Sequence, residues 1–182
     1  MAIKHHWGEY HPHLITLYTS LAYSYLKKGG DQIFAAQKLY EAALKAASAS
    51  LGDNHIKTAA VKMDYGRLCL KKGSKQEALT YFVNAHSIYN DFLGKSALDT
   101  GHAAFQIAKL YEEQREFKLA LEYASSACEI YQQYYAEAHE MRIFALWHKV
   151  CVLYTLRAEG VKVDSTVLYQ VLLKRDQLIE EE

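Results

Sequence analysis

Apolar and small residues recur at helical spacing along this chain, and the pattern repeats about every 42 residues. Gly8, Gly52 and Gly94 each follow a large apolar residue and lie 44 and then 42 residues apart. Such a period indicates a stacked array in which each unit buries its apolar face against its neighbours. We expect a single domain over 1–182, with repeats at about 7–50, 51–92 and 93–135 and a partial repeat with its cap at 136–180.

Small residues occupy the same places in successive repeats. One such position holds Ala22, Gly66 and Ala108, and a later one holds Ala43, Ala85 and Ala127. Two helices that cross closely need Ala or Gly where their backbones approach each other. Each repeat is therefore predicted to be a hairpin of two antiparallel helices. The predicted fold is an all-α, right-handed α-solenoid with about 3.5 repeats.

Breaks in the helical pattern fall at regular places. Lys27-Lys28-Gly29 and Lys71-Lys72-Gly73 have the glycine and the basic residues typical of a helix end. The third repeat has Gln114-Arg115-Glu116 there, so its turn must form without glycine. Between repeats, Gly52-Asp53-Asn54 and Gly94-Lys95-Ser96 predict further turns.

Polar residues near these turns have expected roles. We expect His11 and His55 to close the turns between repeats by hydrogen bonds to the backbone, and Thr58 and Thr100 to lie near the starts of the following helices. After a helix over 136–157, Asp164-Ser165 can cap a last helix that includes Leu172 and Leu178. That last helix is predicted to close the end of the stack.

Composition and charge narrow the classes of function. Lys plus Arg and Asp plus Glu both number 21, so the basic excess of most nucleic-acid-binding proteins is missing. No apolar run approaches the ~18 residues that cross a bilayer. The odd set of Cys69, Cys128 and Cys151 lies in helical patterns, which favours free thiols in a reducing compartment. With no secretory signal pattern at the start, we expect a cytoplasmic protein without membrane insertion.

The residues also give little indication of catalysis or metal binding. Nine histidines are present, but none forms a His-x3-His pair with a carboxylate on one helix. The sequence has neither a Gly-x-Ser-x-Gly motif nor a phosphate-binding Gly-x-x-x-x-Gly-Lys-Ser/Thr motif. We therefore expect no enzyme activity, no metal site and no cofactor.

Two short motifs resemble a known repeat family. Trp7-Gly8-Glu9-Tyr10-His11-Pro12 and Leu51-Gly52-Asp53-Asn54-His55 are similar to the Leu-Gly-x-x-His-Pro start of kinesin-light-chain-type tetratricopeptide repeats. Glu77-Ala78-Leu79-x-Tyr81-Phe82-x-x-Ala85 fits the same type. The resemblance covers residues 7 to about 135. It implies a scaffold or adaptor that binds a protein or peptide on the concave face formed by the first helices of successive repeats.

Transferring the groove positions of that family predicts the partner-binding residues, which are Thr16, Tyr23, Lys27, Met63, Arg67, Lys71, Phe105, Lys109 and Glu113. Arg67, Lys71 and Lys109 would bind carboxylates of an acidic peptide that also carries an aromatic residue, with Met63 and Phe105 as an apolar floor. The register makes Arg67 and Lys109 neighbours. Trp147 is expected in the core rather than in this groove.

Two other functions fit the same fold. The chain could be the helical domain of a larger enzyme, since the repeats are also similar to the C-terminal helical region of SET/MYND-type methyltransferases. It could instead be a structural subunit packed permanently inside a large assembly. A broad exposed apolar face would favour permanent packing, and a charged groove would favour a reversible peptide binder.

Overall fold

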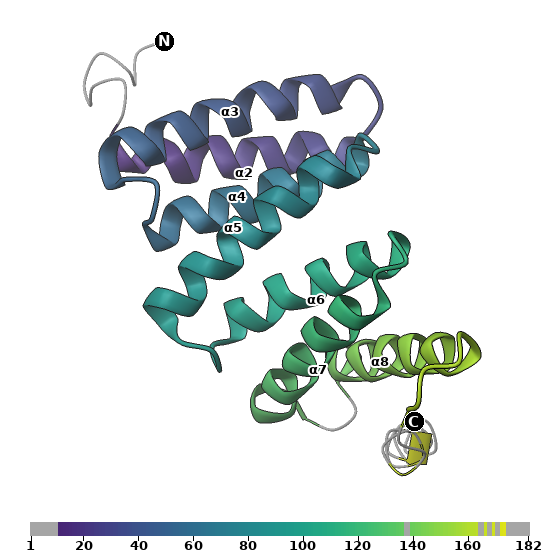
Figure 1. Ribbon diagram of the computed structural model, residues 1–182. Coiled ribbons are helices and arrows are strands. Elements are labelled where there is room, and N and C mark those ends of the chain that lie inside the picture. The colour runs from purple at the N-terminus through teal and green to yellow at the C-terminus, as the bar shows by residue number, and fades with distance from the viewer. Residues whose placement is uncertain (1–10, 137–138, 164–165, 167–168, 170–171, 174–182) are drawn as a thin grey trace. The chain divides into compact units, whose positions relative to one another are not determined.

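The computed structural model describes residues 11–136, 139–163, 166, 169 and 172–173, and this part of the chain is helical without strands (Figure 1). Its helices are α2 (Pro12–Lys28), α3 (Gln32–Leu51), α4 (Ile56–Lys71), α5 (Lys75–Leu93), α6 (Leu98–Glu113), α7 (Phe117–Tyr134) and α8 (Glu140–Ala158). Contacts divide the chain into two compact units, 1–92 and 93–182. The single domain expected over 1–182 stays a prediction.

In the first unit, α2 pairs with α3, and α3 packs in turn against α4 (Figure 1). The core cluster between these helices consists of Ala43, Ala46 and Ala47 of α3, Ile15 of α2 and Val61 of α4. A Cβ atom built on Gly66 of α4 would lie 2.5 Å from the Phe82 ring of α5. The small residue expected at this position is therefore required for α4 and α5 to approach each other.

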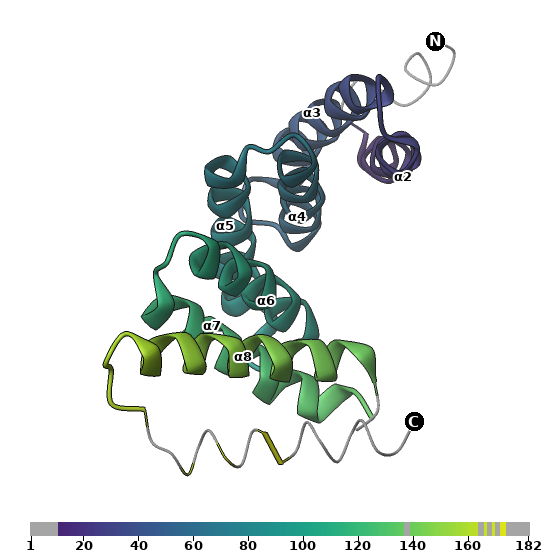
Figure 2. The same cartoon turned by 90° about the vertical axis from the view of Figure 1, so that its right-hand side faces the viewer.

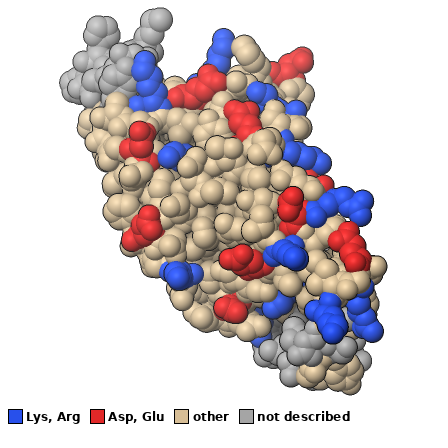
Figure 3. Space-filling view, viewed as in Figure 1, with Lys and Arg blue, Asp and Glu red and all other residues tan. Residues whose placement is uncertain are grey.

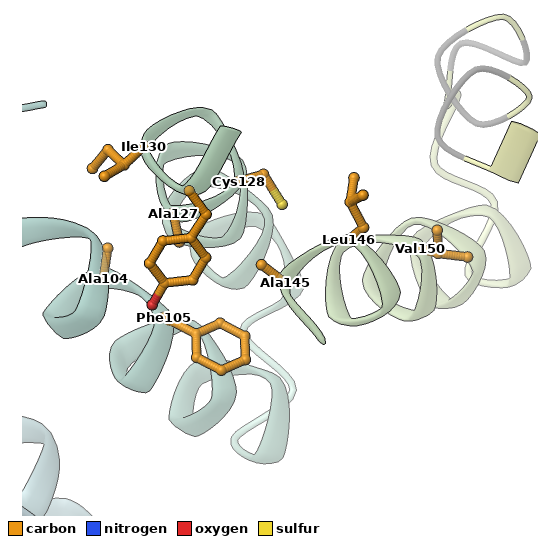
Figure 4. Close-up of a cluster of buried hydrophobic side chains, with 9 residues drawn as sticks. Ala104, Phe105, Ala127, Cys128, Ile130, Ala145, Leu146 and Val150 are labelled. Carbon is orange, nitrogen blue, oxygen red and sulfur yellow. The ribbon is translucent and has the colours of Figure 1, made fainter. Parts of the chain in front are cut away.

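In the second unit, α7 packs against both α6 and α8 (Figure 2). Figure 4 shows part of its core, in which side chains from all three helices meet. The buried members of this cluster are Ala104, Phe105, Ala127, Cys128, Ile130, Tyr131, Ala145, Leu146 and Val150. The helical hairpin predicted for the third repeat is thus present as α6 and α7, with small residues buried between the two helices.

The turn before each of two first helices is closed by the same threonine contact. Thr58 donates from its hydroxyl to the Gly52 carbonyl oxygen at 2.7 Å, and Thr100 donates to the Gly94 carbonyl oxygen at 3.0 Å. Both glycines have a φ of +91°, in a region that residues with a Cβ rarely adopt. The glycine therefore turns the chain, and the buried threonine six residues later holds the turn to the next helix.

Histidines cap three of the first helices. In α2, α4 and α8, the Nδ1 atoms of His11, His55 and His139 accept hydrogen bonds from the backbone N–H two residues later, at 3.3, 3.1 and 3.2 Å. These contacts confirm the expected role of His11 and His55. Ala97 precedes α6 with a similar extended backbone but makes no side-chain cap.

The turn inside the third repeat forms without glycine, as expected. Gly29 and Gly73 have φ values of +70° and +80° after α2 and α4. Arg115, at the position that corresponds to Gly73, takes a φ of +64°. This left-handed conformation costs roughly 1–2 kcal/mol in a residue with a Cβ.

The end of the chain is described only in part. α8 begins at Glu140 and not at 136, because His139 caps it there. Leu172 packs against the core of the second unit. Asp164, Ser165 and Leu178, on which the predicted cap and the end of the last helix depend, lie outside the described residues, as does the Trp7–Tyr10 motif.

Candidate functional site

A hollow of about 770 Å³ lies on the first unit between α2 and α4. We call it the α2/α4 hollow, and it is lined by Tyr23, Leu26, Lys27, Arg67, Leu70 and Lys71. Each lining residue of α2 has its counterpart in α4 exactly one repeat, 44 residues, later. The hollow therefore follows from the repeat itself, because the same three positions of two neighbouring first helices face one space.

The lining of the α2/α4 hollow carries three positive charges and no acidic residue. Lys27 places its Nζ atom 5.4 Å from the centre of the Tyr23 ring, a distance at which a cation is attracted to the aromatic face. Leu26 and Leu70 supply apolar surface beside the cations. A concave site of this composition favours an anionic ligand that also has apolar surface.

Arg67 is held by an acidic neighbour just outside the lining. Its Nη1 atom lies 2.6 Å from Oδ1 of Asp64, three residues earlier on α4. Burial raises the pKa of the Asp64 carboxyl above its ordinary value, and the positive charge of Arg67 offsets only part of this rise. The pair fixes the position of the guanidinium, which still has about half of its side chain exposed for further hydrogen bonds.

Asp64 also borders a second, smaller space on the same side of α2 and α4. Its volume is about 160 Å³, and its lining is Ile15, Thr16, Thr19, Lys57, Ala60, Val61 and Asp64. Tyr40 of α3 is fully buried, and its hydroxyl makes no hydrogen bond within the described structure. Burial, followed by the charge of Asp64, raises the pKa of Tyr40. Asp64 thus lines the smaller hollow and contacts Arg67 of the α2/α4 hollow.

The first unit brings together most of the residues predicted there. Tyr23, Lys27, Arg67 and Lys71 all line the α2/α4 hollow, and Thr16 lines the smaller one. Met63 is different, because only 4% of its surface is exposed. Its predicted role as a groove floor therefore depends on a small exposed edge within a side chain that mainly packs in the core.

The remaining predicted residues lie on α6 in the second unit. Lys109 and Glu113 are exposed, while Phe105 is buried and belongs to the core cluster. The Lys109 Nζ atom lies 5.9 Å from the Phe105 ring centre. Because Arg67 and Lys109 belong to different units, their proximity stays a prediction.

One expectation about helix α8, the burial of Trp147, was wrong. Trp147 was expected in the core, but 51% of its surface is exposed. The apolar spacing of α8 placed it near the buried Leu146 and Val150, and a difference of one residue turns a side chain by about 100° around a helix. Trp147 is thus available at the surface of the second unit.

Three functional candidates were missed by the sequence interpretation. Leu26 and Leu70 immediately precede Lys27 and Lys71 and occupy equivalent positions, so their pairing across repeats was the available signal. Asp64 precedes Arg67 by three residues, a spacing at which side chains meet on a helix. These residues can be predicted only when their positions around the helices are known, and the repeat provides those positions.

The described residues contain no group of three or more His, Cys, Asp or Glu side chains that could hold a metal ion. None of the described helices is both long enough and apolar enough to span a bilayer. On the face drawn in Figure 3, basic and acidic side chains are interspersed over a largely uncharged surface. The three cations of the hollow lining, of which Arg67 is paired with Asp64, are therefore a local feature, because the net charge of the chain is zero.

Solved structures provide further comparison. BtubC (BKLC) from P. vanneervenii is similar with a TM-score of 0.76 and 17% sequence identity over 92% of this chain. The chain spans 63% of the length of that protein. A putative kinesin light chain from Podosopora anserina, with nearly identical TPR-like repeats, gives a TM-score of 0.67 and 16% identity, covering 93% of this chain and 87% of that one. At these identities the likeness concerns the fold, an all-α repeat fold.

No curated protein matches the chain. The family model for the tetratricopeptide repeat matches residues 16–89 and 75–133, which together cover more than half of the chain. These matches include all the helices from α3 to α6 and most of α2 and α7. Repeats of this kind generally mediate protein–protein interaction. The chain belongs to the tetratricopeptide repeat family, and its fold is similar to that of the putative kinesin light chain.

Proposed function

We propose that this chain is a non-enzymatic adaptor of the cytoplasm that binds an extended peptide segment of a partner protein. The segment lies across the first helices of the repeats and carries carboxylates and at least one aromatic residue. The observation that carries this proposal is the α2/α4 hollow, with three cations, two leucines and a tyrosine on its lining.

The chemistry of the lining assigns a role to each side chain. Arg67 offers a planar fork of donors that fits a carboxylate, and Lys27 and Lys71 add charge on either side. Leu26 and Leu70 bury part of an apolar or aromatic side chain of the ligand. On binding, Arg67 either keeps its ion pair with Asp64 or replaces that carboxylate with one from the ligand. In both cases the ligand gains charge-assisted hydrogen bonds and no unpaired cation becomes buried.

The second unit extends the binding surface in this proposal. Lys109 and Glu113 are exposed on α6, and the edge of Phe105 contributes apolar contact. Lys109 would bind a further acidic position of the ligand, while Glu113 would favour a basic or neutral position beside it. The partner segment is thus acidic where it meets the first unit and more mixed where it meets the second.

A structural role within a larger assembly is the second candidate. It is favoured by exposed aromatic residues on α8, since large exposed apolar side chains mark interaction surfaces. Permanent packing through α8 and peptide binding by the α2/α4 hollow would use different helices.

Capture of partners from extracts of the source cell tests the proposal. The bait is the whole chain, and its matched variant reverses three charges with Arg67→Glu, Lys71→Glu and Lys109→Glu. We expect the variant to lose partners that mass spectrometry identifies with the wild-type chain. A control with Lys38→Glu, Lys75→Glu and Lys118→Glu, all outside the hollow, should keep them. Equal capture by both variants would show that the groove assignment is wrong.

A further inference from the structure

Helix α8 presents a row of aromatic side chains to solvent. Phe144, Trp147 and Tyr154 are 56%, 51% and 48% exposed, and the partly buried Cys151 lies between the last two. The spacing of 3, 4 and 3 residues places these four on one stripe of the helix. We call it the α8 stripe. The opposite face of α8 is buried against α7 through Val152 and Leu156.

The core of the second unit does not bury this stripe. The residues of α8 that enter its core are Ala145, Leu146 and Val150, which Figure 4 shows. His148 at the edge of the stripe contacts α6, with its Nδ1 atom 2.9 Å from Oε2 of Glu112. α8 is therefore fixed on two sides within its unit, and three large aromatics remain on the side that faces outward. Contiguous exposed aromatics in a folded protein mark an interaction surface.

The order of residues in the stripe identifies the partner that fits it. Spacings of 3, 4 and 3 read the same in both directions, so the stripe is symmetric about the level of Lys149. When two α8 helices lie antiparallel about a two-fold axis at that level, Phe144 faces Tyr154 of the second copy. Trp147 then faces the small Cys151 of the second copy, so a large side chain fits against a small one at both central contacts.

The ends of α8 also favour an antiparallel arrangement. An antiparallel pair also sets each positive helix N-terminus beside a negative C-terminus. We propose that the chain forms a homodimer in solution through the α8 stripes of two copies.

The size of the surface sets the strength of this dimer. Three half-exposed aromatic side chains offer on the order of 100 Å² each, since a whole aromatic side chain buries about 150–250 Å². Even with the flanking residues, the interface is at the low end of specific interfaces, below about 1,200 Å² in total. An interface of this size is typical of weak, reversible association.

Sedimentation equilibrium over about 1 μM to 1 mM of the whole chain tests the proposal without any peptide ligand. We expect the average mass to rise from 20.8 kDa toward twice that value. Trp147→Glu should keep the chain at the monomer mass. Tyr134→Glu, which changes an equally exposed aromatic (54%) on α7, should dimerise like the wild type. A wild-type chain that stays monomeric throughout, or a Trp147→Glu chain that dimerises normally, overturns the proposal.

Thiol crosslinking locates the interface independently. Cys69 and Cys128 are buried, so Cys151 is the accessible thiol within the described residues. A bismaleimide that spans the 8–10 Å typical of two packed helices should join two copies in the wild type but not in Cys151→Ser. A dimer that forms by sedimentation yet gives no Cys151-dependent crosslink would place the interface elsewhere and contradict the α8 assignment.

Discussion

The Nδ1 atom of His55 accepts a hydrogen bond from the backbone N–H of Lys57 at 3.1 Å, and this contact starts helix α4. Histidine performs here the task usually given to Ser, Thr, Asp or Asn, since its ring nitrogen satisfies an N–H that has no partner inside the helix. The same contact occurs at His11 and His139. One residue type therefore caps three of the four described helices that begin repeats.

Removing this cap should destabilise the first unit. His55→Ala leaves the Lys57 N–H without its partner, and we expect the free energy of unfolding to fall by about 1 kcal/mol. His55→Asn supplies another acceptor at the same place and should keep most of that stability. Urea unfolding followed by circular dichroism measures both variants. An Ala variant as stable as the wild type would mean that the cap contributes nothing.

The first helix of the third repeat offers the converse experiment. Ala97 has the extended backbone of a capping residue, with φ −73° and ψ 145°, but no side chain that can accept. Ala97→Asn introduces an acceptor, so the free energy of unfolding should rise by about 0.5–1 kcal/mol. Ala97→Val, which adds bulk without an acceptor, is the matched control and should show no gain.

Arg115 provides a third test because it occupies a glycine position of the repeat. Its φ of +64° is unfavourable for a side chain with a Cβ, and its contact with Glu159 at 3.3 Å is exposed and contributes little. Arg115→Gly should therefore stabilise the chain by about 1 kcal/mol, measured as a rise in the denaturation midpoint. Arg115→Ala keeps the Cβ and loses the same ion pair, so it should not stabilise.

His148 should make stability depend on pH. Burial lowers the pKa of His148 below its ordinary 6.5, although Glu112, 2.9 Å away, raises it, and Lys109 acts in the same direction as burial. The unfolded chain then binds a proton more readily than the folded one. This contribution is full above the unfolded pKa and is lost as pH falls below it. His86, whose pKa burial also lowers, adds the same trend.

Unfolding free energies between about pH 7.5 and 5.5 check this expectation. The wild-type chain should lose stability toward the acid end, and His148→Gln should lose less over the same range. Stability that is constant or rises toward pH 5.5 would indicate that the ion pair with Glu112 outweighs burial.

Much of the fold could be predicted from the sequence because its determinants are local and repeated. Gly52 and Gly94 mark the turns, and Gly66 marks a close approach of two helices, since each position tolerates few other residues. Burial at the border of a helix face was harder to predict. Met63 and Phe105 hold groove positions of the repeat yet are buried, whereas Trp147 is exposed. Those outcomes depend on which neighbouring helix covers one side of the residue, and the sequence pattern does not specify that.

The candidate site was likewise predictable in part. Tyr23, Lys27, Arg67 and Lys71 were predicted by transferring the groove positions that the family resemblance implies, and all four line the α2/α4 hollow. The contact of Arg67 with Asp64 fixes the guanidinium but depends on side-chain rotamers, which the spacing permits without requiring.

The most direct test of the account is the affinity of the chain for a labelled peptide of alternating Glu and Tyr residues, measured by fluorescence anisotropy at low and high salt. We predict binding that salt weakens, and a loss of at least about tenfold on Arg67→Glu with Lys71→Glu, because each charge-assisted bond contributes roughly 1.5–3 kcal/mol. Lys95→Glu with Lys118→Glu, an equal change of charge outside the α2/α4 hollow, should bind nearly as the wild type does. Equal affinity of the two double variants would contradict the claim that this hollow receives an acidic ligand.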